Sequence, residues 1–83
     1  MTQVALITGA ARGIGLASAQ VFHENGYQVI LLDRDQDALE AAIADFPQAV
    51  PLLFDIADPQ AGGLIAAQIK DKFGRLDCLV NNA

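Results

Sequence analysis

Short runs of apolar residues alternate with longer segments of helical periodicity along this chain. Residues 4–7 and 29–32, inside runs at 4–8 and 28–33, are continuously apolar, which is typical of strands buried on both faces of a parallel sheet. Half-exposed antiparallel strands would instead alternate apolar and polar residues. Two further runs, at residues 49–54 and 78–80, bring the number of predicted strands to four.

A helix is predicted between each pair of neighbouring runs. The first spans about residues 13–25, where apolar residues recur at helical spacing. The second begins after Asp35, whose side chain can cap its N-terminus. The third begins at Asp58, which is followed by Pro59 as an N-cap and first-turn pair, and ends at Gly74.

The predicted order of elements is therefore β-α-β-α-β-α-β with short connections. Right-handed crossovers make this a partial doubly wound (Rossmann) parallel sheet in the α/β class, with strand order 3-2-1-4. The first two helices then cover one face, and the third covers only part of the other. The last strand ends as an unpaired edge, which favours self-association or pairing with another chain.

Composition limits the partners of the chain. Its 83 residues are 53% hydrophobic and have a formal net charge of −5, which indicates one folded domain at most. Five Lys and Arg against ten Asp and Glu give no basic surface for nucleic acid or an anionic membrane. No apolar run approaches a membrane span. The single cysteine, Cys78, fits a reducing cytoplasmic location and is expected to be a small buried hydrophobe.

The glycine-rich segment Thr-Gly-Ala-Ala-Arg-Gly-Ile-Gly at residues 8–15 follows the first strand and opens the first helix. A dinucleotide pyrophosphate needs backbone N–H donors at a helix N-terminus, a turn without side chains and a close helix-to-strand contact. Gly9, Gly13 and Gly15 suit these three needs. The alternative is a tight turn whose glycines serve only packing.

Asp33 closes the second strand, 18 residues after Gly15. An acidic side chain there accepts hydrogen bonds from the adenosine ribose hydroxyls, which favours NAD. A 2′-phosphate beside Asp33 would bring two negative charges together, although the nearby Arg12 and Arg34 would partly offset the repulsion. Alternatively, Asp33 only begins a solvated turn or caps the second helix.

Polar residues also follow the third and fourth strands, at the sheet edge where ligands bind in open α/β folds. Asp55, followed by Ile56, is placed to accept a hydrogen bond from the adenine amino group. Asn81 and Asn82, followed by Ala83, would either offer amide and backbone groups to the adenosine or tie neighbouring strands together. Taken alone, each segment also fits an ordinary turn at a strand end.

Taken in order, these four segments resemble the N-terminal part of the short-chain dehydrogenase/reductase family over the whole length of the chain. The matches are its glycine motif, its NAD-selecting acid, its adenine-site pair and its Asn-Asn-Ala motif. The cofactor-binding residues expected from the motifs and the resemblance are Gly9, Arg12, Gly13, Ile14, Gly15, Asp33, Arg34, Asp55, Ile56, Asn81, Asn82 and Ala83.

The resemblance implies reversible hydride transfer between NAD, less readily NADP, and an alcohol or carbonyl substrate in a homo-oligomeric enzyme. The family's catalytic serine and Tyr-x-x-x-Lys pair lie downstream, and neither Ser18 nor Tyr27 matches them. We therefore expect residues 1–83 to be the N-terminal part of a dinucleotide-binding Rossmann domain, inactive alone because the catalytic half is absent. The alternatives are a fragment that binds only the ADP moiety and an interaction fragment completed by another chain.

Overall fold

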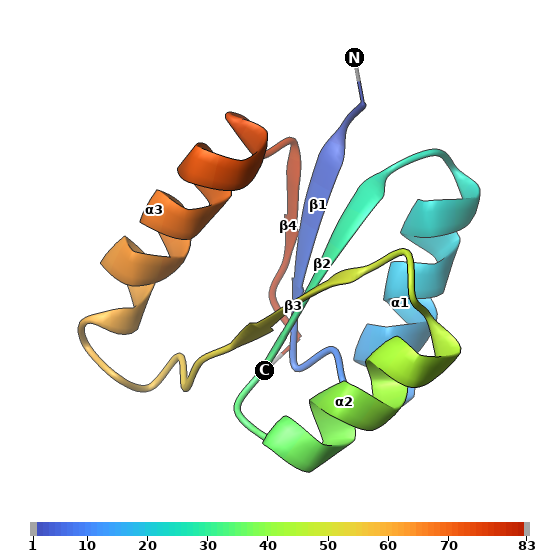
Figure 1. The fold of residues 1–83 in the computed structure, drawn as a ribbon, viewed down its shortest axis with the longest axis horizontal. Helices are drawn as coiled ribbons and strands as arrows, with labels where there is room; N and C mark the ends of the chain where they lie inside the picture. The colour runs from blue at the N-terminus through green and yellow to red at the C-terminus, as the bar shows by residue number, and fades with distance from the viewer. Residues whose placement is uncertain (1, 83) are drawn as a thin grey trace.

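A computed structural model describes residues 2–82, which form a parallel sheet flanked by three helices (Figure 1). The sheet order is β3-β2-β1-β4, and each neighbouring pair is parallel. Both the predicted fold class and the strand order are confirmed. The elements, in chain order, are β1 (Val4–Thr8), α1 (Gly13–Glu24), β2 (Gln28–Asp33), α2 (Gln36–Asp45), β3 (Val50–Leu53), α3 (Ala61–Phe73) and β4 (Cys78–Val80).

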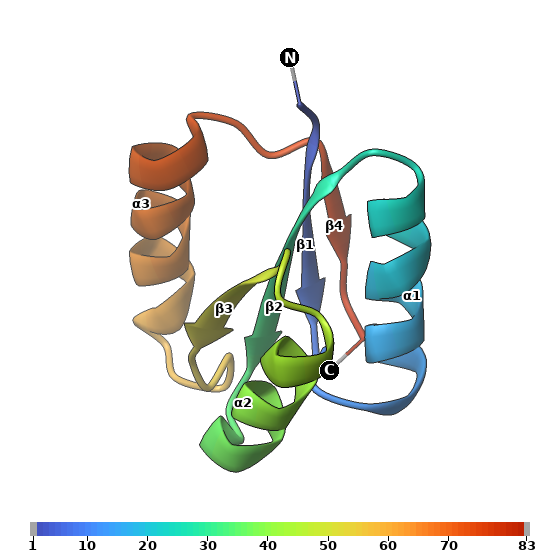
Figure 2. The same ribbon diagram turned by 45° about the vertical axis from the view of Figure 1, so that its right-hand side comes forward.

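The two central strands supply both halves of the core because successive residues of a strand point to opposite faces. On one face Ile7 and Leu31 lie fully buried beneath α1 and α2, and on the other Leu6 and Ile30 pack with residues of α3. Figure 2 shows α3 on one side of the sheet and the other two helices on the opposite side. The continuously apolar sequence of both strands follows from this burial on two faces.

The α3 side of the sheet is only partly covered, as the strand order implies. Leu79 of β4 is 57% exposed, and Leu76, just before this strand, is 43% exposed. β4 pairs with β1 and with no other strand in the described part of the chain. Cys78 is half-buried rather than buried, because it lies on this short edge strand.

The predicted start of the third helix is wrong by about two residues, since α3 begins at Ala61 with Gln60 as its N-cap. Asp58 instead forms a separate turn. Its carboxylate accepts a hydrogen bond from the Gln60 N–H (2.9 Å), and its carbonyl accepts one from the Ala61 N–H (3.0 Å). An aspartate that bonds the backbone two residues ahead forms such a turn as readily as it caps a helix.

Candidate cofactor-binding site

The glycine-rich turn leads from β1 into an uncapped helix N-terminus. Arg12 is the N-cap residue of α1, but its side chain makes no capping hydrogen bond, and the first turn contains no acidic residue. The first helical hydrogen bond runs from the Leu16 N–H to the Arg12 carbonyl (3.3 Å). The N–H groups of Gly13, Ile14 and Gly15 precede it and have no acceptor inside the helix. Such a terminus attracts an anion through its free donors and the positive end of the helix dipole.

The turn requires glycine for two different reasons, as Gly13 and Gly15 show. Gly13 has φ +59°, a left-handed conformation that other residues adopt only under strain, and nothing lies within 4 Å of where its Cβ would be. Gly15 is buried, and a Cβ there would lie 2.3 Å from the Gly9 carbonyl oxygen and 2.9 Å from Asn82 Nδ2. Gly13 therefore leaves open space in front of the helix, whereas Gly15 allows the helix to approach the turn behind it.

The end of β4 is tied to this turn by side-chain hydrogen bonds. The buried Thr8 hydroxyl accepts from the Asn82 N–H (2.9 Å) and lies 3.3 Å from both the Val80 carbonyl oxygen and Asn81 Oδ1. Asn82 Nδ2 donates to the Gly9 carbonyl (3.3 Å). Of the two roles left open for the asparagines, tying neighbouring strands is the one their contacts match.

The Asp33 carboxylate, at the end of β2, faces the glycine-rich turn. Its Oδ2 accepts a hydrogen bond from the Ala11 N–H (3.1 Å), and its Oδ1 accepts one from the Asp35 N–H (3.0 Å). A carboxylate has about four acceptor positions, so about two stay available to a ligand. Asp33 is half-buried and joins two connections that are distant in sequence, so it is more than part of a solvated turn.

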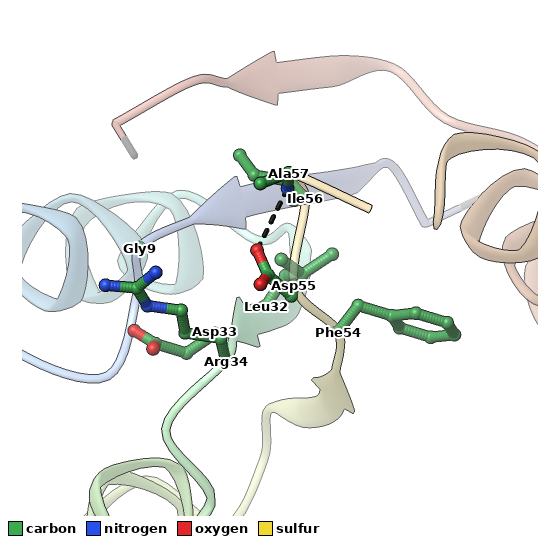
Figure 3. Close-up of a pocket in the computed structure, with 8 residues that line it drawn as sticks. All are labelled: Gly9, Leu32, Asp33, Arg34, Phe54, Asp55, Ile56 and Ala57. Carbon is green, nitrogen blue, oxygen red and sulfur yellow. Dashed lines mark hydrogen bonds between the residues drawn. The ribbon is translucent and has the colours of Figure 1, made fainter. Parts of the chain in front are cut away.

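An open cleft of about 450 Å³ lies beside Asp33, a volume within the usual range for small-molecule sites. Figure 3 shows Asp33 and Arg34 extending on the side of Gly9, with the Phe54 ring directed the other way. The Asp55 Oδ1 accepts a hydrogen bond from the Ala57 N–H (2.9 Å) within its own turn. The lining residues are Gly9, Leu32, Asp33, Arg34, Phe54, Asp55, Ile56 and Ala57.

An ion pair connects the glycine-rich turn to the turn that follows β2. Arg12 Nη2 lies 2.5 Å from Asp35 Oδ2, and the other oxygen of Asp35 accepts a hydrogen bond from the Ala38 N–H (3.1 Å). The predicted capping role of Asp35 in α2 is thus confirmed. The Ala38 N–H, followed by the Arg12 guanidinium, lowers the pKa of Asp35 below its ordinary value of 3.8.

The structure brings together most of the residues singled out from the sequence, in two groups. Gly9, Asp33, Arg34, Asp55 and Ile56 line the cleft. Outside that lining, Arg12, Gly13, Ile14 and Gly15 belong to the glycine-rich turn, and Asn81 and Asn82 bond to it. Ala83 lies outside the described residues. Sequence reasoning missed Leu32, Phe54 and Ala57, although each is next to a residue it named.

Tyr27, His23 and Ser18 lie away from the cleft. The Tyr27 ring packs edge-on against Phe22, with centroids 5.0 Å apart, at the end of α1 remote from the glycine-rich turn. The exposed His23, in the last turn of α1, packs edge-on against Phe46, with ring centroids 5.1 Å apart. Ser18 lies within α1. We assign a catalytic role to none of them.

The sequence profile of the short chain dehydrogenase family matches residues 3–83. The chain belongs to this family. Similar members are the galactitol 2-dehydrogenase of Agrobacterium fabrum, 44% identical over 82 residues, and the L-fucose dehydrogenase of Bos taurus, 37% identical over 81 residues. Each alignment covers 98% of this chain, but 32% and 30% of the respective relatives.

Solved structures of short chain dehydrogenases share the fold. The L-sorbose reductase of Gluconobacter frateurii, crystallised with NADPH and L-sorbose, superposes with a TM-score of 0.90 at 33% identity, covering 99% of this chain and 33% of that one. The chain thus spans about a third of the length of the relatives it matches. Within residues 2–82, no helix is long and apolar enough to cross a membrane.

Proposed function

We propose that residues 1–83 bind the adenosine diphosphate half of NAD in a protein that transfers hydride between this cofactor and an alcohol or carbonyl substrate. The observation that carries the proposal is the position of Asp33, whose carboxylate bonds the glycine-rich turn at Ala11 and borders the cleft lined by Arg34 and Asp55. Membership of the short chain dehydrogenase family supports the reaction class.

The residues around the turn fit a dinucleotide. The free N–H groups of Gly13, Ile14 and Gly15 would donate to the pyrophosphate, which the helix dipole also attracts. The space in front of Gly13 is open, and Ile14 is 77% exposed, so phosphate oxygens can approach the backbone. Gly9 has no side chain that would obstruct this approach.

At the adenosine end, the acceptor positions left on Asp33 would take the ribose 2′ and 3′ hydroxyls. The adenine would occupy the cleft between Arg34 and Ile56, with Asp55 as the acceptor for its amino group. A 2′-phosphate would place its negative charge against Asp33. For this reason we propose NAD, rather than NADP, as the preferred cofactor.

The nicotinamide ring of the bound cofactor supplies or accepts the hydride. Residues 2–82 bind and orient the adenosine end, and Thr8 and Asn82 hold the end of β4 against the turn. The groups that bind substrate and move its proton are therefore expected outside this segment. Inactivity of the segment alone, homo-oligomeric assembly and a cytoplasmic location stay predictions.

Calorimetric titration of the complete protein that carries residues 1–83 tests the proposal. We expect tighter binding of NAD than of NADP. ADP-ribose should bind with an affinity similar to that of NAD, because the two share the adenosine ribose. Asp33→Ala should lower the affinity for NAD about ten-fold or more, because hydrogen bonds to a charged group are lost. It should also reduce the difference between the affinities for NAD and NADP. Asp45→Ala is the matched control, since Asp45 ends α2 outside the cleft lining.

Two results would contradict this function. Absence of saturable binding of NAD and ADP-ribose at millimolar concentration would show that this protein has no such cofactor site. Tighter binding of NADP than NAD by the unchanged protein would show that Arg12 and Arg34 outweigh Asp33. Circular dichroism of each variant separates loss of binding from loss of fold.

A further inference from the structure

Two cations lie next in sequence to groups that define the proposed ribose site: Arg34 follows Asp33, and Arg12 follows Ala11, whose N–H donates to Asp33. Their environments differ. Arg34 lines the cleft. Arg12, in contrast, pairs through Nη2 with Asp35 Oδ2 at 2.5 Å. The guanidinium that directly precedes Gly13 is therefore engaged by a carboxylate of the neighbouring connection.

Asp35 is held in place independently of Arg12. Its Oδ1 accepts from the Ala38 N–H at the start of α2, and its own N–H donates to Asp33 Oδ1. One turn therefore fixes both carboxylates, Asp33 toward the glycine-rich loop and Asp35 toward the guanidinium. Because its position is set by the helix cap, Asp35 offers Arg12 a pre-positioned partner.

A phosphate on the ribose 2′ position would be recognised by a guanidinium next to the proposed ribose site. Such a phosphate must compete with Asp35 for Arg12, and it also meets the negative charge of Asp35 itself. We propose that Asp35 is a specificity-determining residue, which favours NAD over NADP by withholding the Arg12 guanidinium from the 2′-phosphate. This inference rests on the proposed function.

The size of the effect follows from exposure. The side chains of Arg12 and Asp35 are 68% and 47% exposed, so water and salt screen their attraction. Exposed pairs of this kind change an equilibrium by about two- to five-fold. Asp33 therefore sets the preference for NAD over NADP, and Asp35 adjusts it. Removing the charge of Asp35 alone should not reverse this preference.

The substitution Asp35→Asn tests the inference in the complete protein, with NAD and NADP as probes. Asparagine caps helices as well as aspartate does, so α2 should remain intact while Arg12 loses its charged partner. We expect the affinity for NADP relative to NAD to rise about three-fold. The control is Asp37→Asn, which removes the same charge from the first turn of α2 without a contact to Arg12.

A second background shows whether the effect passes through Arg12. In the Arg12→Ala background, the further change Asp35→Asn should leave the ratio of the NAD and NADP affinities nearly constant. The reason is that the Arg12 guanidinium, which Asp35 binds in the unchanged protein, is absent. An equal rise in Asp37→Asn and Asp35→Asn, or a full three-fold rise without Arg12, would overturn the inference and leave NAD binding established. Failure of the unchanged protein to bind either cofactor would instead overturn the proposed function, and the inference with it.

Discussion

The connections that follow β1 and β3 both leave the carboxyl end of the sheet, but they are held in contrasting ways. The glycine-rich turn after β1 is bonded to distant segments, through Ala11 to Asp33 and through Gly9 to Asn82. The connection after β3 is bonded almost entirely to itself, as in the hydrogen bond from Ala57 to Asp55. Long-range bonds fix the geometry of the first, whereas hydrogen bonds within the connection set most of the geometry of the second.

Glycines in the glycine-rich turn and at the start of α3, which follows the second connection, also differ in how closely other segments surround them. Gly15 lies where a side chain would meet backbone, 2.3 Å from the Gly9 carbonyl oxygen. Gly62 and Gly63, in the first turn of α3, have nothing within 4 Å of a Cβ position. A glycine that a motif requires and a glycine that a helix only tolerates thus look the same in the sequence, but differ in what surrounds them.

The largest expected effect is that of Gly15→Ala. The added methyl group must push α1 away from the turn, because its nearest neighbour is a backbone oxygen that cannot rotate aside. Overpacking of this kind costs about 1–3 kcal/mol of unfolding free energy. The shift also moves the N–H groups at the start of α1, so we expect NAD affinity to fall about ten-fold or more. Chemical denaturation and calorimetric titration measure the two effects.

The matched control is Gly62→Ala, which adds the same methyl group on an exposed helix face. It should leave NAD affinity unchanged. Wild-type stability and affinity in Gly15→Ala would show that the close approach at Gly15 has no role.

An intermediate effect is expected for Thr8→Val, which keeps the shape of the side chain but removes its hydroxyl. The Asn82 N–H then loses its acceptor, and the end of β4 loses a link to the turn. We expect a loss of about 1 kcal/mol, the usual net contribution of one hydrogen bond. Hydrogen exchange should show reduced protection in β4 with little change in β2. Thr8→Ser keeps the hydroxyl and should keep that protection, so equal losses in the two variants would exclude the hydrogen bond as the cause.

The sequence predicted the fold well because each signal was local. Continuous apolar runs fix buried strands, and Asp35 precedes its helix with the spacing of a cap that the structure confirms. The start of α3 was predicted wrongly, since Asp58 has two local hydrogen-bonding options and the sequence favours neither. The clustering of residues at the sheet edge followed from strand order, and therefore Asp33 and Asp55 were expected together.

The contacts of the site could not be predicted to the same depth. That the Asp33 carboxylate bonds the Ala11 N–H, and that Arg12 turns toward Asp35, depends on side-chain rotamers and on how two connections meet. Neither is encoded in a spacing. The sequence places Phe54 only at the end of an apolar run, whereas in the structure it lies beside Asp55 and lines the cleft. Sequence patterns therefore locate the edge of the sheet, whereas the pairing of charges along it depends on the three-dimensional arrangement of the side chains.

The smallest expected effect is a gain in stability from Gly63→Ala. Gly63 is exposed within α3 and has helical backbone, so alanine fits without strain and reduces the entropy of the unfolded chain. We expect the unfolding free energy to rise by about 0.5–1 kcal/mol in a denaturant titration. Gly13→Ala is the informative counterpart, because its Cβ also has open space but its φ of +59° disfavours alanine. A gain at position 63 with a loss at position 13 would show that backbone conformation, and not space alone, separates the glycine-rich turn from the opening of α3; gains at both positions would contradict that division.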